Sequence, residues 1–473
     1  MIPCLNKLIT LLTVKMQSKI TIYGSAGTGK TTKLMNLIES TLKSGTLAEE
    51  IAFVSFTKKG VREGLERATE LFDLKEEDTK HFGTLHSLCF AAIGMRRENM
   101  LTKKHYKLMS DKIGMKFAGF YTADYTSPDD KYLHAINMKP QNKAKAVELI
   151  EGLPQDVVRR VDFAFMELKR QLGLKDFNDL LVDFVKEKRP LPVKVAFIDE
   201  AQDLTPLQWD VAKLMFQDAE VVYAAGDDDQ AIYEWSGADV HNFLNFSKES
   251  LVLNKSFRLP KAVFDVSQRV VKDIAVRKRK KLTHNGSVGE VTICSDFDTI
   301  DWKGGELVLA RTNYLLDKLI NCIMESGLLF TRKGQLSVKM KTLEAIAAYE
   351  AYCKGGKELT LVQKTEFKEV NKDKHWKSVI HMSEFKAKYY EKVLSTKSFT
   401  KEAIKFETFH SCKGSENDNV YVAIDLSKRV YDNMWRHEDE ELRCLYVAVT
   451  RSKKNLTIIA PKSKRCYNPK YFI

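Results

Sequence analysis

A glycine-rich stretch near the start of the chain has the residue types and spacing of a phosphate-binding loop. It comprises Gly24, Ser25, Ala26, Gly27, Thr28, Gly29, Lys30, Thr31 and Thr32. Glycine lets the backbone follow phosphate oxygens closely, and the first amides of a following helix add hydrogen-bond donors. Lys30 is expected to reach the β- and γ-phosphates, and the Thr31 hydroxyl to ligate Mg²⁺. The stretch therefore predicts a nucleotide site with magnesium, and a chance glycine-rich turn is the alternative.

An acidic pair farther along the chain completes this chemistry. Asp199 and Glu200 end the apolar run 195–198 and open the sequence Asp-Glu-Ala-Gln-Asp. A strand that ends in aspartate places a carboxylate at the sheet edge where bound phosphate lies. We expect Asp199 to hold the metal and Glu200 to polarise an attacking water. A strand that merely ends in a charged turn is the alternative, but the phosphate loop in the same chain favours hydrolysis.

These residues need a sheet to position them, and the sequence pattern supplies one. Apolar strand-like runs alternate with helical periodicity, which is typical of an α/β fold with mainly parallel sheets. Leu34, Leu37 and Ile38 recur at helical spacing just after the glycine-rich stretch. Buried strands are expected at 20–23, 195–198, 221–225, 251–253, 307–310, 420–424 and 456–459. Residues 90–175, largely helical in pattern, and 346–400, polar and rich in lysine, are interpreted as insertions.

Length and charge limit the number of domains and the kind of partner that the chain can have. A chain of 473 residues predicts two to four domains at about 100–200 residues each. The 76 basic and 63 acidic residues differ by 76 − 63 = 13, which is the net charge of +13. A basic surplus favours a polyanionic partner, nucleic acid or an anionic membrane, although many basic surfaces are only solvated.

The cysteines and apolar runs indicate the compartment. The eight cysteines are scattered without a CxxC pair, so the sequence predicts neither a zinc site nor a disulfide framework. A reducing, intracellular compartment fits this pattern. No run approaches the ~18 apolar residues of a membrane-spanning helix. The short apolar run 8–14 is interpreted as part of an N-terminal helix or extension rather than a signal peptide.

Several ordered blocks resemble the motifs of the UvrD/Rep-type superfamily 1 (SF1A) DNA helicases. Beyond the phosphate loop and the acidic pair, they lie at 55–59, 83–89, 176–181, 226–238, 256–258, 408–416 and 445–451. A phosphate loop alone occurs in many protein families, but this ordered set spans residues 24 to 451 and is highly specific. The resemblance implies two RecA-like P-loop NTPase domains with parallel sheets, each carrying a mostly helical insertion.

The same resemblance assigns roles at the nucleotide. Gln230 would sense the γ-phosphate or its water, and Arg258 and Arg451 would be arginine fingers that stabilise developing charge. Phe257 stands where the family often has an adenine-stacking tyrosine, and Glu416 would contact the ribose. The implied catalytic set is Lys30, Asp199, Glu200, Gln230, Arg258 and Arg451.

The resemblance also implies contacts to the nucleic acid track. Phe56, Tyr233 and Trp235 match positions that stack on bases, and Thr57 and His86 match backbone contacts. Stacking is tolerant of sequence and contributes about 1–3 kcal/mol per base. Core packing is the alternative for each aromatic residue. No residue excludes RNA as the track.

The implied domain boundaries follow the motif order. The first RecA-like domain would be formed by two segments around a helical insertion, and the second by two segments around a short insertion. The expected ranges are 1–89, 90–175 and 176–258 for the first domain, and 259–345, 346–400 and 401–473 for the second.

Some features depart from the family pattern. No fitting adenine-reading glutamine precedes the loop, because Gln17 lies too close to the first strand. Ser236 and Ser415 replace a frequent arginine and a leucine, and the second insertion is unusually short. The basic run 277–281 is interpreted either as a phosphate contact or as a solvated face.

We expect an ATP-dependent DNA helicase that moves 3′ to 5′ on single strands and unwinds duplex, using ATP and Mg²⁺. The alternative is a DNA-stimulated ATPase that unwinds poorly without a partner. A non-catalytic scaffold conflicts with the complete catalytic set. Expected partners are single-stranded DNA, its junctions with duplex, and replication or repair proteins, but no membrane. The expected location is the cytoplasm or nucleoid.

Overall fold

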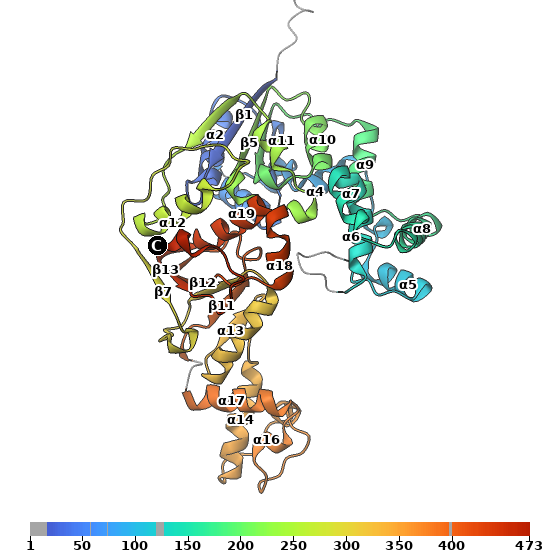
Figure 1. Cartoon of the computed structure of the whole chain (residues 1–473). Helices are drawn as coiled ribbons and strands as arrows, with labels where there is room; N and C mark the ends of the chain where they lie inside the picture. Colours follow the sequence, from blue (N-terminus) through green and yellow to red (C-terminus); the bar gives the residue numbers. More distant parts are fainter. Residues whose placement is uncertain (1–16, 57, 73, 120–126, 397–399) are drawn as a thin grey trace, which may run out of the picture. The chain divides into compact units, whose positions relative to one another are not determined.

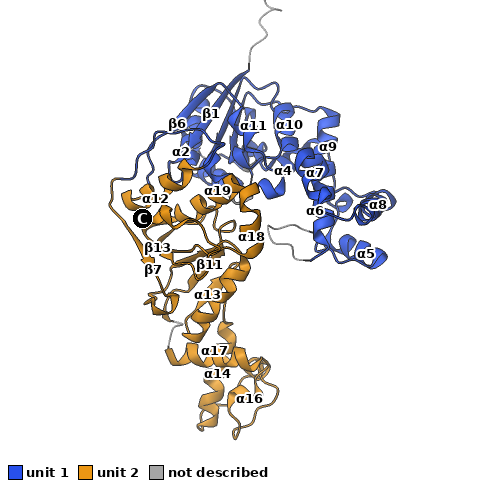
Figure 2. Cartoon of the chain, in the orientation of Figure 1, with its two compact units in different colours: residues 1–258, 274–285 blue, residues 259–273, 286–473 orange. Residues whose placement is uncertain are grey.

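The structure is a computed structural model that describes residues 17–56, 58–72, 74–119, 127–396 and 400–473 (Figure 1). The chain forms two compact units, coloured separately in Figure 2. Unit 1 comprises residues 1–258 and 274–285, and unit 2 comprises residues 259–273 and 286–473. The chain therefore passes between the units three times, whereas the expected domain boundaries place a single crossing after Arg258.

Unit 1 is built on a six-stranded sheet with the order β3-β2-β4-β5-β1-β6. Every neighbouring pair in this sheet is parallel. The strands are β1 (Ser18–Gly24), β2 (Ile51–Ser55), β3 (Phe82–Gly83), β4 (Val195–Asp199), β5 (Val221–Gly226) and β6 (Glu249–Leu253). Because the pairs are parallel, the phosphate loop after β1 and the residues that follow β4 and β5 meet at one edge.

Both faces of this sheet are buried under helices. Alternation along β1 directs Ile22 to one apolar cluster with Leu34, and Tyr23 to a second cluster with Trp209. Figure 1 shows α2 on one side of β1 and β5 and α10 and α11 on the other. The covering helices are α2 (Lys30–Lys43), α3 (Lys58–Phe72), α4 (Leu85–Ala92), α9 (Phe177–Glu187), α10 (Pro206–Met215) and α11 (Val240–Leu244).

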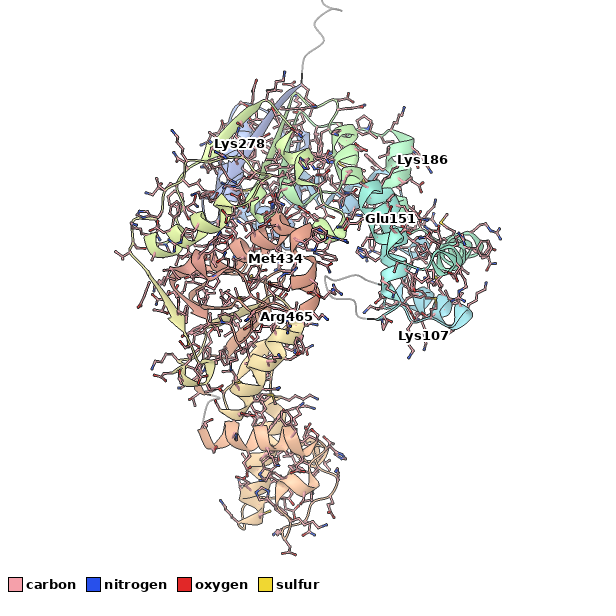
Figure 3. The ribbon with its side chains drawn as sticks, viewed as in Figure 1. Lys107, Glu151, Lys186, Lys278, Met434 and Arg465 are labelled. Atoms are coloured by element: carbon pink, nitrogen blue, oxygen red, sulfur yellow. The ribbon has the colours of Figure 1, made fainter. Side chains whose placement is uncertain are left out.

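The region expected to be a helical insertion in unit 1 has its own apolar core. Its further helices are α5 (Lys103–Ile113), α6 (Asp130–Gln141), α7 (Lys143–Glu151) and α8 (Gln155–Leu172). Met109, Leu133, Val161 and Phe165 pack together from α5, α6 and α8. Figure 3 labels Lys107 on α5 and Glu151 at the end of α7. This helical group therefore has a core separate from those on the two faces of the sheet.

Unit 2 contains a seven-stranded sheet with the order β10-β9-β11-β8-β12-β13-β7. Its neighbours are parallel except β9 and β10, which are antiparallel. The strands are β7 (Glu290–Cys294), β8 (Leu307–Ala310), β9 (Phe330–Arg332), β10 (Gln335–Leu336), β11 (Ile404–Thr408), β12 (Asn417–Ala423) and β13 (Ser452–Ile459). Its helices near the sheet are α12 (Lys261–Lys272), α13 (Asn313–Glu325), α18 (Lys428–Asn433) and α19 (Glu438–Val449).

The short insertion of unit 2 contains helices joined by non-helical segments. Its helices are α14 (Met340–Cys353), α15 (Leu361–Lys364), α16 (Trp376–Val379) and α17 (Glu384–Thr396). Tyr349, Trp376 and Tyr390 are buried in the same apolar cluster as strands of the sheet. This insertion is therefore continuous with the core of unit 2.

The structure confirms the expected α/β class and a strand at each of the seven expected positions. The expectation that 251–253 is buried is wrong, because β6 lies at the edge of its sheet and none of its residues is buried. The expected strands did not include β2, β3, β7, β9, β10 or β11. Strands β3, β9 and β10 have only two or three residues, and β7 and β11 alternate apolar with polar or charged residues. Strand β2 is a fully buried, mainly apolar run like β4, and its pattern could have indicated it. The motif at 408–416 begins at Thr408, the last residue of β11, so the resemblance indicated the turn after this strand but not the strand itself.

Two further observations concern the thiols and the apolar character of the helices. The seven cysteines within the described residues are free thiols. Within the same residues, no helix combines the length and the apolar character that crossing a bilayer requires.

Candidate active site

The phosphate loop connects β1 to α2 in unit 1, as its pattern predicts. Gly27 and Gly29 have φ values of 71° and 77°, which glycine adopts without strain. A Cβ on Gly27 would lie 2.3 Å from the Cβ of Arg258, so the loop backbone packs too closely there for a side chain. Lys30 Nζ donates to the carbonyl oxygen of Gly24 at 3.0 Å. The ammonium is thus held inside the curve of the loop, where phosphate oxygens would meet it.

Asp199 and Thr31 face one another beside this loop. The Thr31 hydroxyl donates to Asp199 Oδ2 at 3.4 Å. Burial and the negative charge of Glu200 raise the pKa of Asp199 to about 7, against the opposing effect of Lys30. A hydroxyl and a carboxylate are the hard oxygen ligands that Mg²⁺ prefers. This pair fits a magnesium ion, whose charge would also stabilise the ionised Asp199.

Glu200 has a strained backbone and a directed side chain. Its φ is 52°, one of the positive values held by non-glycine residues in the structure. Such strain recurs at functional sites, where the surroundings hold it in place. Glu200 Oε2 accepts a hydrogen bond from Gln202 Nε2 at 2.6 Å. Gln202, the third residue after β4, therefore orients the Glu200 side chain.

Gln202 connects this acidic motif to the next one. Its Oε1 accepts the backbone N–H of Asp227 at 3.0 Å, and Asp227 Oδ2 accepts Gln230 Nε2 at 2.6 Å. A Cβ on Gly226 would lie 2.3 Å from Gln202 Oε1, so glycine is needed for this approach. No role was predicted for Gln202 or Asp227 from the sequence, although Gln202 belongs to the acidic motif and Asp227 to the motif at 226–238.

Three consecutive aspartates follow β5 and are named here the aspartate triplet: Asp227, Asp228 and Asp229. All three are buried, and cations of the basic run neutralise them. Lys280 Nζ lies 3.1, 2.5 and 2.9 Å from their respective carboxylates, and Arg277 Nε lies 2.6 Å from Asp229 Oδ1. Two residues of the run thus form internal ion pairs, which neither interpretation of this run included.

The segment after β6 packs against the phosphate loop. Ser256 Oγ donates to the carbonyl oxygen of Ala26 at 2.8 Å, and the Phe257 N–H donates to that of Gly27 at 2.8 Å. The Phe257 ring is 68% exposed, with Lys255 Nζ 5.6 Å from its centroid. An exposed ring beside the phosphate loop is available to stack on a base. Arg258 follows directly and contacts Gly27.

The aromatic residues expected to contact DNA lie together in unit 1. The ring centroids of Phe56 and Tyr233 are 5.3 Å apart, and those of Tyr233 and Trp235 are 6.3 Å apart. The ring centroid of His134, in α6, lies 6.3 Å from that of Trp235. Ser236, which stands where the family often has arginine, donates to the carbonyl oxygen of Tyr233 at 2.8 Å. The structure therefore assembles one aromatic row from Phe56, Tyr233 and Trp235.

His86 and Thr57 are the remaining expected DNA contacts. His86 lies in α4 and meets Phe177 edge-on at 5.7 Å. Burial lowers the pKa of His86 to about 4, so the ring is neutral at pH 7 and can donate a hydrogen bond without charge. Thr57 lies outside the described residues. Gln17 donates to the carbonyl oxygens of Phe216 and Ala219, which engages it away from the loop.

Unit 2 holds the last two expected nucleotide contacts. Arg451 follows α19 and donates through Nε to the carbonyl oxygen of Val447 at 2.8 Å and through Nη1 to that of Ser415 at 3.3 Å. Glu416 Oε1 lies 3.9 Å from Lys453 Nζ. The hydrogen bond to Ser415 thus brings the motifs at 408–416 and 445–451 side by side within unit 2.

Comparison with known proteins agrees with these motifs. Residues 5–250 match the UvrD/REP helicase N-terminal domain. The ATP-dependent DNA helicase PcrA of Leuconostoc citreum is 25% identical over 304 residues, which are 58% of this chain and 40% of that protein. PcrA of Staphylococcus aureus strain Mu50 is 24% identical over 299 residues, with the same coverage. A probable DNA helicase II homolog of Mycoplasma capricolum is 25% identical over 313 residues, 60% of this chain and 43% of that protein.

The match to this chain therefore spans about two fifths of the length of these relatives. The matched family region nevertheless covers more than half of the chain and includes the phosphate loop, the acidic pair and the motif at 226–238. The chain belongs to the UvrD/Rep helicase family.

Proposed function

We propose that this chain is an ATP-dependent DNA helicase that moves 3′ to 5′ on single strands and separates duplex ahead of it. ATP would be hydrolysed between two RecA-like domains, with direction and nucleotide position taken from the family. The track is single-stranded DNA and its junctions with duplex.

In this proposal the residues of unit 1 bind ATP and activate water. Lys30 and the loop amides bind the phosphates, and Thr31 with Asp199 would hold Mg²⁺. The ion would supply charge stabilisation at the phosphate oxygens. Glu200 takes a proton from the attacking water, and Gln230 orients that water or the γ-phosphate.

The remaining nucleotide contacts come from both units. Phe257 stacks on the adenine and Glu416 contacts the ribose. Arg258 and Arg451 stabilise the negative charge that develops during phosphoryl transfer, an effect of about 10³–10⁵ in rate where such residues have been measured.

The aromatic row gives the DNA contact. Phe56, Tyr233 and Trp235 stack on successive bases, and His86 donates to the DNA backbone. Stacking tolerates any base sequence, which a motor requires as it moves along a strand.

One observation supports the proposal most strongly. Within unit 1, Glu200, Gln202, Asp227 and Gln230 form a continuous hydrogen-bonded chain, and Lys30 and Asp199 lie at the same sheet edge. Such a chain orients a general base and a phosphate sensor together, an arrangement that hydrolysis needs and nucleotide storage does not.

Unwinding of 3′-tailed and 5′-tailed duplexes with ATP and Mg²⁺ tests activity and direction together. We expect the 3′-tailed duplex to be unwound at least tenfold faster. Preference for the 5′ tail would refute the direction, and no ATP-dependent unwinding of either duplex would refute helicase activity by the chain alone.

The short insertion of unit 2 favours a second candidate. Its helices α14, α16 and α17 share the core of unit 2, and the family often has a large subdomain at this point. The chain would then be a DNA-stimulated translocase that unwinds poorly without a partner. Displacement of streptavidin from a 3′-biotinylated or 5′-biotinylated single strand detects translocation without duplex. Displacement without unwinding of either tailed duplex supports the second candidate, and unwinding by the chain alone excludes it.

A further inference from the structure

The chain returns to unit 1 after α12, and this returning segment, residues 274–285, packs against unit 1. Backbone hydrogen bonds hold it there. The Thr283 N–H donates to the carbonyl oxygen of Asn254 at 2.7 Å, and the Ser256 N–H donates to the carbonyl oxygen of Thr283 at 2.9 Å. The ammonium of Lys278, labelled in Figure 3, lies 5.6 Å from the ring centroid of Tyr23 in β1. The segment is thus fixed to unit 1 at several points.

The segment brings a buried ammonium into the aspartate triplet. The Lys280 side chain is 0% exposed, and its Nζ lies within 3.1 Å of a carboxylate oxygen of all three aspartates. Arg277 donates twice to Asp229, at 2.6 and 2.7 Å, and the Lys278 N–H donates to Asp228 at 2.6 Å. The carboxylates are close enough together to hold a metal ion, but the ammonium already occupies the space among them.

The charge of the triplet depends on these cations. Burial and repulsion from the neighbouring aspartates raise the pKa of Asp228, in spite of Lys280. Burial would also raise the pKa of Asp229, but Lys280 and Arg277 outweigh it and hold that pKa below its ordinary value. Removing one cation from buried carboxylates leaves uncompensated charge, which the surrounding structure must relieve by rearranging.

The triplet in turn orients the proposed catalytic side chains. Asp227 Oδ1 accepts from Lys280 at 3.1 Å, and its Oδ2 accepts from Gln230 at 2.6 Å. The Asp227 N–H binds Gln202, whose amide donates to Glu200. A shift of Asp227 would therefore move both Gln230 and Glu200.

We propose that Lys280 is a positioning residue for ATP hydrolysis: its ammonium fixes the aspartate triplet so that Gln230 and Glu200 keep one orientation. This inference rests on the proposed ATPase function. Lys280 acts through Asp227 and touches no substrate. The segment that follows the first helix of unit 2 thereby becomes part of the catalytic support of unit 1.

The test compares Lys280→Met, which removes the charge and keeps the volume, with Lys280→Arg, which keeps the charge. Steady-state ATP turnover with single-stranded DNA, equilibrium binding of a fluorescent ATP analogue, and thermal unfolding are measured for each. We expect Lys280→Met to lower kcat about 100-fold, the size of a 1 Å misplacement, with nucleotide affinity within about threefold. Lys280→Arg should recover at least a tenth of wild-type turnover.

Lys281→Met is the matched control, because Lys281 is an exposed lysine next in sequence; its turnover should stay within about twofold of wild type. If Lys280→Met unfolds, Lys280→Met with Asp228→Asn restores the charge balance. A double variant that folds but keeps a low kcat supports the positioning role of Lys280. A double variant that folds and also regains the wild-type kcat overturns that role. Wild-type turnover in Lys280→Met, or equal losses of kcat, affinity and stability, also overturns it. If the wild-type chain shows no ATP turnover, the proposed function fails instead.

Discussion

Each unit holds a buried polar network just beyond its central strands, and the two networks differ in what they connect. In unit 2, Arg311 follows β8 and donates twice to Glu441 of α19, at 2.7 and 2.6 Å. Tyr467 donates to the same carboxylate at 2.9 Å. In unit 1, the aspartate triplet follows β5 and is joined by Lys280 and Arg277.

The partners of each network explain the difference. The unit 2 network joins β8, α19 and the C-terminal segment through Arg311, Glu441 and the Tyr467 hydroxyl. Arg311 Nη1 also lies 3.4 Å from His410 Nδ1, in the turn after β11. The unit 1 network contains three carboxylates and continues through Gln202 to Glu200 and Gln230. We infer that burial of charge stabilises the fold in unit 2 and orients proposed catalytic groups in unit 1. Variants in the two networks should therefore affect different measurements.

The largest effect on folding is expected from Arg311→Met in unit 2. Removing one partner of a buried ion pair leaves Glu441 uncompensated and costs roughly 3–5 kcal/mol. Chemical denaturation should show this loss of unfolding free energy. Lys388→Met is the control, because its pair with Glu384 is exposed to solvent and should contribute little to the unfolding free energy. If Arg311→Met loses no more unfolding free energy than Lys388→Met does, the unit 2 network does not stabilise the fold as we infer.

Gly226→Ala should affect turnover through the unit 1 network. The new Cβ would meet Gln202 Oε1 at 2.3 Å and the Phe243 ring at 2.8 Å, which displaces the amide from Asp227 and Glu200. We expect about a 100-fold lower kcat for DNA-stimulated ATP turnover, equal to about 2.7 kcal/mol. Gly152→Ala, where a Cβ meets nothing closer than 4.0 Å, is the control. Normal turnover in Gly226→Ala would show that the chain of hydrogen bonds does not position Glu200.

Trp235→Ala tests the aromatic row of unit 1. Loss of one stacked base should weaken binding of single-stranded DNA by about 1–3 kcal/mol. Fluorescence anisotropy with a labelled oligonucleotide measures this change. Trp435→Ala in unit 2 is the control, because Trp435 is an exposed tryptophan with no proposed contact to DNA. Equal affinities in the two variants would place the DNA contact elsewhere.

The smallest effect is a pH dependence of unit 1 stability. Burial lowers the pKa of His134 to about 4, below the ordinary value of 6.5. Between these values the unfolded chain binds a proton that the folded chain does not, so stability falls as pH falls from about 6.5 to 4. We expect roughly 1–2 kcal/mol less unfolding free energy at pH 5 than at pH 7. His134→Gln should reduce this dependence, and an unchanged pH profile would contradict the assignment.

The sequence predicted the parts of unit 1 that local patterns encode. The phosphate loop and the acidic pair each lie in one short stretch, next to a strand whose apolar run is visible. Lys280 and Arg311 could not be assigned in this way, since their partners lie 52 and 130 residues away. A basic run indicates charge but does not indicate which aspartates the fold will bring to it.

The network through Gln202 was partly accessible from the sequence. Gln202 is a visible member of the acidic motif, but its bond to Asp227 depends on β4 and β5 being neighbours in the sheet. Strand order is a property of the whole unit and does not follow from the spacing of residues in one motif. Gly226 could have indicated the close approach, because glycine at the end of a strand often permits one.

The most direct test of the central claim is ATP turnover by the wild-type chain and by Glu200→Gln, with and without single-stranded DNA. We predict that DNA stimulates the wild type at least tenfold, and that Glu200→Gln binds a fluorescent ATP analogue normally but turns over at least 100-fold more slowly with DNA. Turnover by Glu200→Gln at the wild-type rate would contradict the assignment of Glu200 as the general base for ATP hydrolysis.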